Sequence, residues 1–130
     1  MATWNDVVSY MRSNYKVSDE QPNMIKLVFD LGNLRTQVVV VWHITLNDGQ
    51  EHWAQIESPF GELGTFNLAH ALQQSADSVC GGIGLFGNLV TFRHAVPLAD
   101  LSIGELERPL ALVTTTADRL EQALTGGDAY

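Results

Sequence analysis

Residues 34–46, LRTQVVVVWHITL, carry the strongest β-strand signal in the chain. Four consecutive valines precede tryptophan, isoleucine and threonine, and branched and aromatic side chains favour a pleated, half-buried strand. Because side chains alternate along a strand, its two faces can be separated by position. The even-numbered face, which includes Trp42, is expected in the core. The odd-numbered face contains Val39, Val41 and His43 and is too apolar for an ordinary solvent-exposed face.

The preceding stretch, residues 24–31, alternates apolar and polar side chains and is expected to be a strand. Gly32 and Asn33 then supply a two-residue turn, since glycine tolerates the positive φ that tight hairpins need. In this register Leu31 pairs with Leu34, and apolar residues meet apolar residues across the hairpin. The sequence therefore predicts an antiparallel hairpin on this side of residues 34–46.

The turn at residues 47–49, Asn-Asp-Gly, is compatible with two registers for the next strand. A two-residue Asp-Gly loop would place acidic residues, among them Glu57, beside the face of Trp42. A three-residue loop would instead pair Trp42 with Ala54. Since burying a carboxylate costs free energy, we expect the three-residue loop, followed by a strand that ends near Pro59.

The remaining elements follow from caps, turns and periodicity. They are a helix capped by Thr3 with Asp6, a linker at 17–23, a helix at 66–77, a hairpin at 83–96 and a final helix at 109–124. The apolar stripe of the final helix is expected to pack on the sheet, with self-association as the alternative. Residues 1–130 are thus expected to form a single α+β domain with a five-stranded antiparallel sheet, in the order helix, three strands, helix, two strands, helix.

The charge distribution excludes two classes of partner. The formal net charge is −8, and no Lys or Arg occurs between Arg35 and Arg93. Nucleic acids and anionic membranes need clustered cations, so neither is expected as a partner. No apolar run approaches the roughly 18 residues that cross a bilayer, and the first residues lack a signal-peptide pattern. With one cysteine and hence no internal disulfide, a cytoplasmic location is expected.

The letters of residues 82–87, GIGLFG, match the pattern G-x-G-x-x-G. A dinucleotide site needs a strand before this pattern and a helix after it, whereas here a helix precedes it and a hairpin follows. We therefore interpret it as a glycine-rich strand without a nucleotide cofactor. Gly82 and Gly84 leave one strand face bare, so another backbone or a ligand could approach closely.

No constellation of residues identifies a reaction. His43 and His52 fall on opposite faces in the favoured register, and no His or Cys lies at metal-ligand spacing from another. Cys80 has no neighbouring cation to lower its pKa, which favours an inert thiol. We therefore expect no enzyme, no metal and no cofactor.

The odd-numbered sheet face is the strongest candidate for an interface. In the favoured register Val39, Val41, His43 and Trp53 share it, giving an apolar centre with a polar border. Together with Gly82 and Gly84, these residues are predicted to bind a partner. The alternative is that a helix or the loop at residues 58–65 buries the patch internally.

The order of elements resembles the type III secretion chaperone-like fold and, within it, the YbjN-like family of bacterial sensory transduction regulators. The closest local likeness is the hairpin GLFGNLVTFRHAVPLADLS, residues 84–102, which runs into a helix ending TTTADRLEQAL at residue 124. The resemblance implies a small, acidic, dimeric and non-catalytic protein that binds extended segments of other proteins. We therefore expect a non-enzymatic protein-binding module, chaperone-like or regulatory, whose partners are a second copy of itself and an unknown protein or peptide. The alternative is a small-molecule sensor or cryptic enzyme that uses the strand around Gly82–Gly87.

Overall fold

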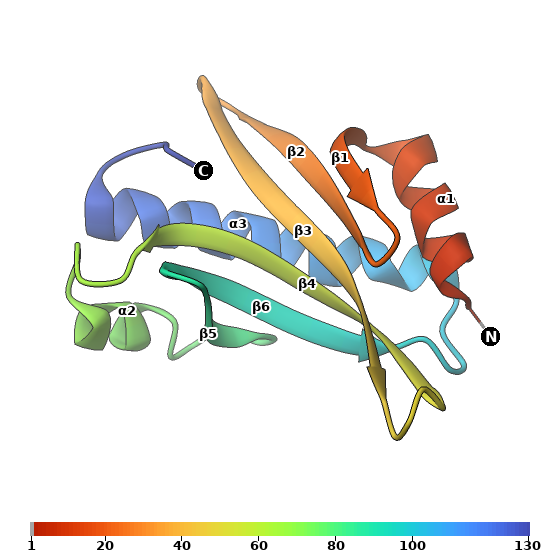
Figure 1. The fold of residues 1–130 in the computed structure, drawn as a ribbon. Helices are drawn as coiled ribbons and strands as arrows, with labels where there is room; N and C mark the ends of the chain where they lie inside the picture. Colours follow the sequence, from red (N-terminus) through yellow and green to blue (C-terminus); the bar gives the residue numbers. More distant parts are fainter. Residues whose placement is uncertain (1) are drawn as a thin grey trace.

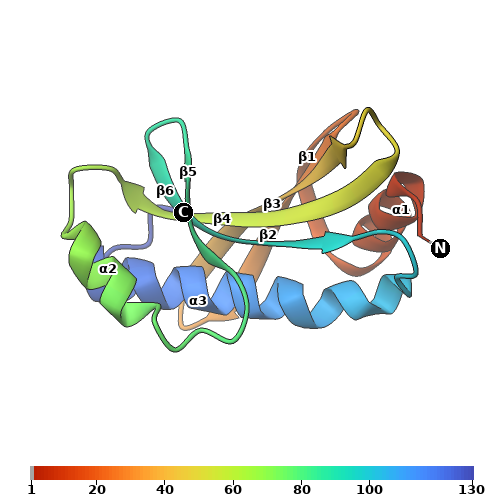
Figure 2. The same ribbon diagram turned by 90° about the horizontal axis from the view of Figure 1, so that it is seen from below.

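The computed structural model describes residues 2–130, which form a six-stranded antiparallel sheet with helices gathered on one of its faces (Figures 1 and 2). The elements are α1 (Trp4–Asn14), β1 (Lys16–Gln21), β2 (Met24–Gly32), β3 (Arg35–Leu46), β4 (Glu51–Glu62), α2 (Leu68–Gln74), β5 (Gly82–Phe86), β6 (Leu89–Pro97), the 3-10 helix η1 (Ile103–Leu106) and α3 (Glu107–Thr125). In the sheet the strands lie in the order β1-β2-β3-β4-β6-β5. The expected α+β class and its helices are confirmed, but the sheet has six strands instead of five.

The strand that the sequence did not predict is β1, at one edge of the sheet. Five of its six residues are exposed, and only Val17 is half-buried. An edge strand with one apolar side chain has no alternating pattern, so these residues were assigned to a linker. Their backbone nevertheless pairs with β2, from Lys16 opposite Val28 to Gln21 opposite Met24.

The two faces of β3 are the reverse of the sequence prediction. Val39 and Val41 are fully buried, and they share the core with Ile25, Leu27 and Ile56. The side chains of Val38, Val40 and Trp42, predicted as core, are half-buried on the opposite face. Helix α3 packs against β3, β4 and β6 on the core side, and within residues 2–130 no helix covers the other side (Figure 2).

The reversal begins in the turn between β2 and β3. Leu34 lies in the turn with a φ of 63° and is fully exposed, so it does not pair with Leu31. Leu27 consequently lies opposite Val39 instead of Val38. A slip of one residue moves every side chain of a strand to the other face. The predicted pairing was therefore wrong by one position.

The register between β3 and β4 was also predicted incorrectly. Trp42 lies opposite Gln55, and Val40 lies opposite Glu57, as a two-residue Asp-Gly loop requires. Pro59 does not end the strand, because β4 continues through an irregularity between Pro59 and Gly61. The loop that the sequence analysis rejected is thus the observed one, and Glu57 is buried after all.

Several local predictions are confirmed. Thr3 and Asp6 form the capping box of α1, and Leu85 pairs with Val90 in the hairpin of β5 and β6. In α3 the apolar stripe packs on the chain's own sheet, and Gly126 ends the helix with a φ of 71°. Within the described residues, none of the helices is long and apolar enough to span a bilayer.

Helix α2 departs from its prediction in both length and burial. It is capped by Asn67 and spans Leu68–Gln74, shorter than the predicted residues 66–77. Apolar helix residues normally point inward, but here only Ala71 is buried, whereas Leu68 and Leu72 are exposed. The helix therefore carries two leucines on its outer surface.

Candidate functional site

We call the helix-free side of the sheet the open face. Its side chains come from alternate positions of five strands and include Met24, Lys26, Val28, Val38, Val40, Trp42, Glu57, Pro59, Phe86, Leu89, Thr91 and Arg93. A groove of about 380 Å³ lies on it, lined mainly by its apolar members. The hairpin of β5 and β6 projects on the side away from α3 and forms one wall (Figure 2). There the ring of Phe86 packs against Trp42, with centroids 5.4 Å apart.

A buried ion pair lies in the wall of this groove. Glu57 is only 4% exposed and accepts hydrogen bonds from Trp42 Nε1 at 3.1 Å, from Thr91 Oγ1 at 2.7 Å and from the guanidinium of Arg93. Arg93 also donates to the carbonyl of Leu85 at 2.9 Å. Two neutral donors and the positively charged guanidinium compensate the carboxylate, so burial does not exclude it from the sheet. The pair fixes the wall between β3, β4, β6 and β5.

Gly84 is needed for this arrangement. A Cβ on Gly84 would lie 2.2 Å from Nε of Arg93, so the missing side chain makes room for the guanidinium. The sequence predicted free space for a ligand beside Gly84, but the side chain of Arg93 occupies this space. Beside Gly82, by contrast, no heavy atom lies within 4 Å of the Cβ position.

A second charged cluster holds the C-terminal residues. Carboxylate oxygens of Asp118, Glu121 and Asp128 lie within 4.8 Å of one another, and Arg35 Nε donates to Asp118 at 2.9 Å. Burial raises the pKa of Glu121, whose carboxylate accepts from the backbone N–H groups of residues 129 and 130. Because Arg35 already supplies the cation among these acids, we interpret the cluster as a clamp. It places Tyr130 at the rim of the groove.

Three aromatic rings meet at the opposite end of the sheet. The rings of Trp4 and His43 stack with centroids 5.1 Å apart and planes 8° apart, and His43 Nε2 lies 2.9 Å from His52 Nδ1. The two histidines were predicted on opposite faces, but the observed register brings them to the same side. Burial lowers the pKa of His43, and the neighbouring His52 contributes to the same shift. The cluster was not predicted, because the expected three-residue loop places His43 and His52 on opposite faces of the sheet.

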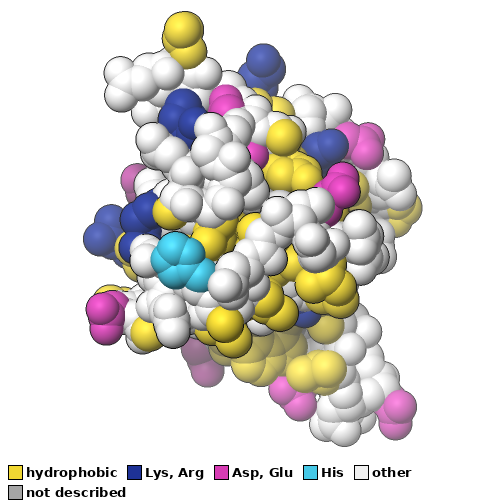
Figure 3. Space-filling model, turned by 90° about the vertical axis from the view of Figure 1, so that its left-hand side faces the viewer, with side chains coloured by type: hydrophobic (Ala, Val, Ile, Leu, Met, Phe, Trp, Pro, Cys, Tyr) yellow, Lys and Arg dark blue, Asp and Glu magenta, His cyan; other side chains and the backbone are white. Residues whose placement is uncertain are grey.

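Exposed apolar side chains gather around α2. Leu63, Leu68, Leu72 and Val79 are 44%, 40%, 55% and 94% exposed, and Leu85 of the neighbouring strand is 51% exposed. The view onto this end of the molecule shows hydrophobic side chains interspersed among polar ones (Figure 3). Strand β5 is the edge of the sheet here, and its sequence, GIGLF, contains no charge. We call this surface the α2 patch.

The six residues predicted to bind a partner do not form one surface. Val39 and Val41 are fully buried beneath the helices and offer no surface to a partner. His43 lies in the aromatic cluster, and Trp53 lies opposite Ile44, on the other side of β4 from its expected position. Gly82 and Gly84 lie on edge strand β5, next to the α2 patch. Roles for His43, Trp53 and the two glycines in partner binding stay predictions.

Comparison with known proteins finds a similarity at the level of the fold. No family model matches it, and no curated protein matches it. Among solved structures it is similar to a chain of the HopA1–SchA chaperone–effector complex, with a TM-score of 0.55 and 15% sequence identity over 88% of each chain. At this identity the likeness concerns the fold alone. It supports the chaperone-like α+β fold that the sequence analysis expected.

Proposed function

We propose that this chain is a non-enzymatic protein-binding module, chaperone-like or regulatory, whose open face binds an apolar segment of another protein. The observation that carries the proposal is a sheet face that combines apolar side chains with a groove and has no covering helix within residues 2–130. The similar solved structure is that of a chaperone–effector complex. As parts of the same proposal, the chain is related to the YbjN-like proteins and is located in the cytoplasm.

The chemistry of the open face favours an apolar occupant. Val38, Val40 and Trp42 are half-buried on it, and a free sheet face of an ordinary monomer would be polar. The one carboxylate in the groove wall, Glu57, is already neutralised by Arg93. Among the described residues of the lining, the other charged side chains are those of Lys26, opposite Val40, and of Asp19 on the edge strand β1. An apolar centre with a polar margin is the usual anatomy of a protein interface.

We further propose that the module is a homodimer formed through the α2 patch. Two copies of a chain with a net charge of −8 repel each other, so contact is favoured where charge is sparse. Residues 63–92 contain a single formally charged residue, Asp77. The edge strand β5 can pair with the same strand of a second copy, which would satisfy its outer backbone groups and cover the leucines of α2.

Suppression of aggregation tests the binding role of the open face. Insulin B chain, released from insulin by reduction, serves as an aggregating apolar probe monitored by light scattering. The parent protein at equimolar concentration should delay aggregation. The double variant Val38→Asp/Val40→Asp should lose most of this effect, because two carboxylates then line the groove.

The matched control for this assay is Thr115→Asp/Gln122→Asp, which adds the same charge on the exposed surface of α3. It should protect as well as the parent. If the charged variant does not fold, Val38→Thr/Val40→Thr replaces it, because threonine keeps the shape and branching of valine. This variant should lose part of the protection. Equal protection by the parent and by both open-face variants would refute the proposal, as would a parent protein without any effect.

The dimer is tested separately by sedimentation equilibrium. The parent should be dimeric at micromolar concentration, and Leu72→Lys should raise the dissociation constant at least tenfold, because it places a cation in an apolar contact. The control Leu46→Lys, at the far end of β3, changes a similarly exposed leucine and should leave the association unchanged. A monomeric parent, or equal effects of the two variants, would contradict the proposed dimer.

A further inference from the structure

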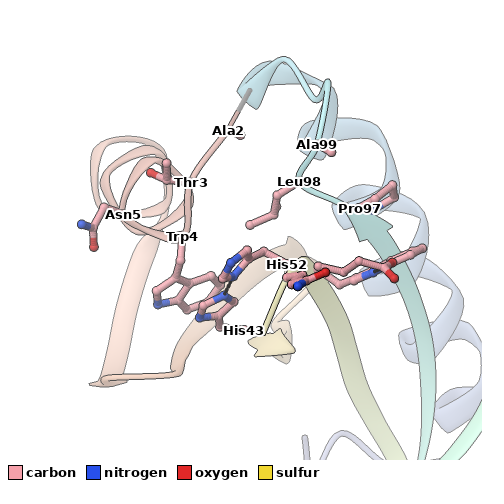
Figure 4. A pocket seen from close by; sticks show the side chains of 12 residues that line it. Ala2, Thr3, Trp4, Asn5, His43, His52, Pro97, Leu98 and Ala99 are labelled. Carbon is pink, nitrogen blue, oxygen red and sulfur yellow. Dashed lines mark hydrogen bonds between the residues drawn. The ribbon is translucent and has the colours of Figure 1, made fainter. Parts of the chain in front are cut away.

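A cavity of about 630 Å³ lies at the end of the molecule that is remote from α2 (Figures 1 and 4). It is enclosed by the first turn of α1, the hairpin of β3 and β4, and the loop that follows β6. Pro97 and Leu98 provide apolar lining, and Trp4, His43 and His52 form an aromatic wall (Figure 4). Its size is in the range of small-molecule and side-chain pockets. The cavity is separate from the groove of the open face.

The aromatic wall is held together by a hydrogen bond between its two histidines. Nε2 of His43 and Nδ1 of His52 are 2.9 Å apart, while their ring centroids are 5.1 Å apart, so the rings meet edge to edge. Such a bond needs one of the two facing nitrogens without a proton. Burial and the neighbouring His52 lower the pKa of His43. At least one of the two imidazoles in this bond is therefore neutral.

Among the described residues that line the cavity, the only formally charged side chain is that of Glu51. One of its oxygens, Oε1, accepts a hydrogen bond from Trp53 Nε1 at 3.2 Å. Among the described residues the other oxygen has no hydrogen-bond partner. The carboxylate of Glu51 is thus hydrogen-bonded to the edge of the Trp53 indole, and both groups line the cavity.

The amino-terminal end of α1 also faces the cavity, but it is already capped. The N–H of Asp6 donates to Thr3 Oγ1 at 3.2 Å, and the N–H of Thr3 donates to Asp6 Oδ2 at 2.9 Å. The carboxylate of Asp6 also offsets the positive end of the helix dipole. With these donors used and no Lys or Arg in the lining formed by residues 2–130, the lining favours a cation over an anion.

We propose that this cavity binds a guanidinium group, the side chain of an arginine in a polypeptide, which stacks on the indole of Trp53 and donates hydrogen bonds to the carboxylate of Glu51. A planar guanidinium stacks on an indole face and forms charge-assisted hydrogen bonds with a carboxylate. An acidic chain attracts such a segment from a distance, since its net charge is −8. The inference goes beyond the proposed function, because other residues line the groove that is proposed to bind an apolar segment.

Nuclear magnetic resonance titration tests this assignment with Nα-acetyl-arginine amide as the probe. The indole N–H signal of Trp53, identified by its loss in Trp53→Phe, should shift in a saturable manner. Nα-acetyl-citrulline amide, which has nearly the same shape without the charge, should bind at least tenfold more weakly. Equal binding of the two probes, or no saturable shift with either, would overturn the proposal.

Two variants separate the cavity from general attraction to an acidic protein. Glu51→Gln should weaken arginine binding at least fivefold, and because Glu51 is exposed the change should not unfold the chain. The control Glu62→Gln removes an exposed carboxylate at the other end of β4 and should change nothing. Equal effects of the two variants would show that the site is not the cavity.

A peptide probe tests whether the bound guanidinium belongs to an arginine within a polypeptide. Acetyl-Gly-Arg-Gly amide should bind at least as tightly as the single amino-acid probe. A tenfold loss in the peptide would overturn the assignment to a polypeptide. The test uses neither an aggregating client nor an open-face variant, so its failure is distinct from a failure of the proposed function.

Discussion

The carboxylate of Glu57 lies between β3 and β6 and is 4% exposed. Its partners Thr91 and Arg93 are 34 and 36 residues away in the sequence. The expectation that a carboxylate stays out of a buried sheet considers the carboxylate alone. The free energy of burying it depends on the hydrogen-bond donors that surround it. The sequence around Glu57 contains no sign of these donors, so the register of β4 could not be predicted from local pattern.

Removing the cation of this pair should destabilise the fold. Arg93→Met leaves a buried carboxylate with only neutral donors, and we expect the free energy of unfolding to fall by about 2–4 kcal/mol, less than for a fully buried pair because Arg93 is 34% exposed. Urea denaturation measures the change. The double variant Glu57→Gln/Arg93→Met should recover more than half of the loss. A single variant as stable as the parent would show that the pair is not coupled to folding.

The lowered pKa of His43 predicts a pH dependence of stability. The folded protein binds a proton at this residue less readily than the unfolded chain, whose histidines titrate near about 6.5. Stability should therefore be fully present above about pH 7 and should decrease as the pH falls through the unfolded pKa towards the lower folded one. His43→Phe should flatten the slope of the free energy of unfolding between about pH 7 and 5. The control Gln73→Ala, on exposed α2, changes no titratable group and should keep the slope of the parent.

At the scale of elements, the reliable predictions rest on signals contained within one element. The stripe of α3 and the two-residue turn between β5 and β6 are local, and both are observed. The faces of β3 were not predictable in the same way, because both carry apolar side chains and only the register of the neighbouring strands decides between them. Strand β1 has one half-buried apolar residue, so its sequence contains almost no strand signal.

The packing of α3 against the sheet is expected to dominate the stability of the helix layer. Leu120 is fully buried, and Leu120→Ala should lower the free energy of unfolding by about 2–5 kcal/mol through the lost contacts and the cavity that remains. Chemical denaturation is the measurement. Gln122→Ala, two residues further and exposed, should stay within about 0.5 kcal/mol of the parent. If both variants were equally stable, α3 would not be packed as described.

On the scale of the whole molecule, the two faces of the sheet differ in what covers them. The core face packs against helices of the same chain, and within residues 2–130 no helix covers the open face (Figure 2). The sequence indicated an apolar sheet face with an interface role, but Val39 and Val41, which were assigned to it, belong to the core. A strand with apolar residues on both faces does not by itself indicate which face the chain's own helices cover, and the folded structure is needed to decide.

Methyl-resolved nuclear magnetic resonance with an unfolded client tests the central claim most directly, because adjacent valines of β3 report opposite faces. Reduced and carboxymethylated α-lactalbumin, a chain that stays unfolded, is added to the methyl-labelled protein. The account predicts that the methyl signals of Val38 and Val40 shift or broaden in a saturable manner, while those of Val39 and Val41, fully buried under the helices, do not. Perturbation of Val39 and Val41 without Val38 and Val40, or of neither pair, would contradict binding at the open face.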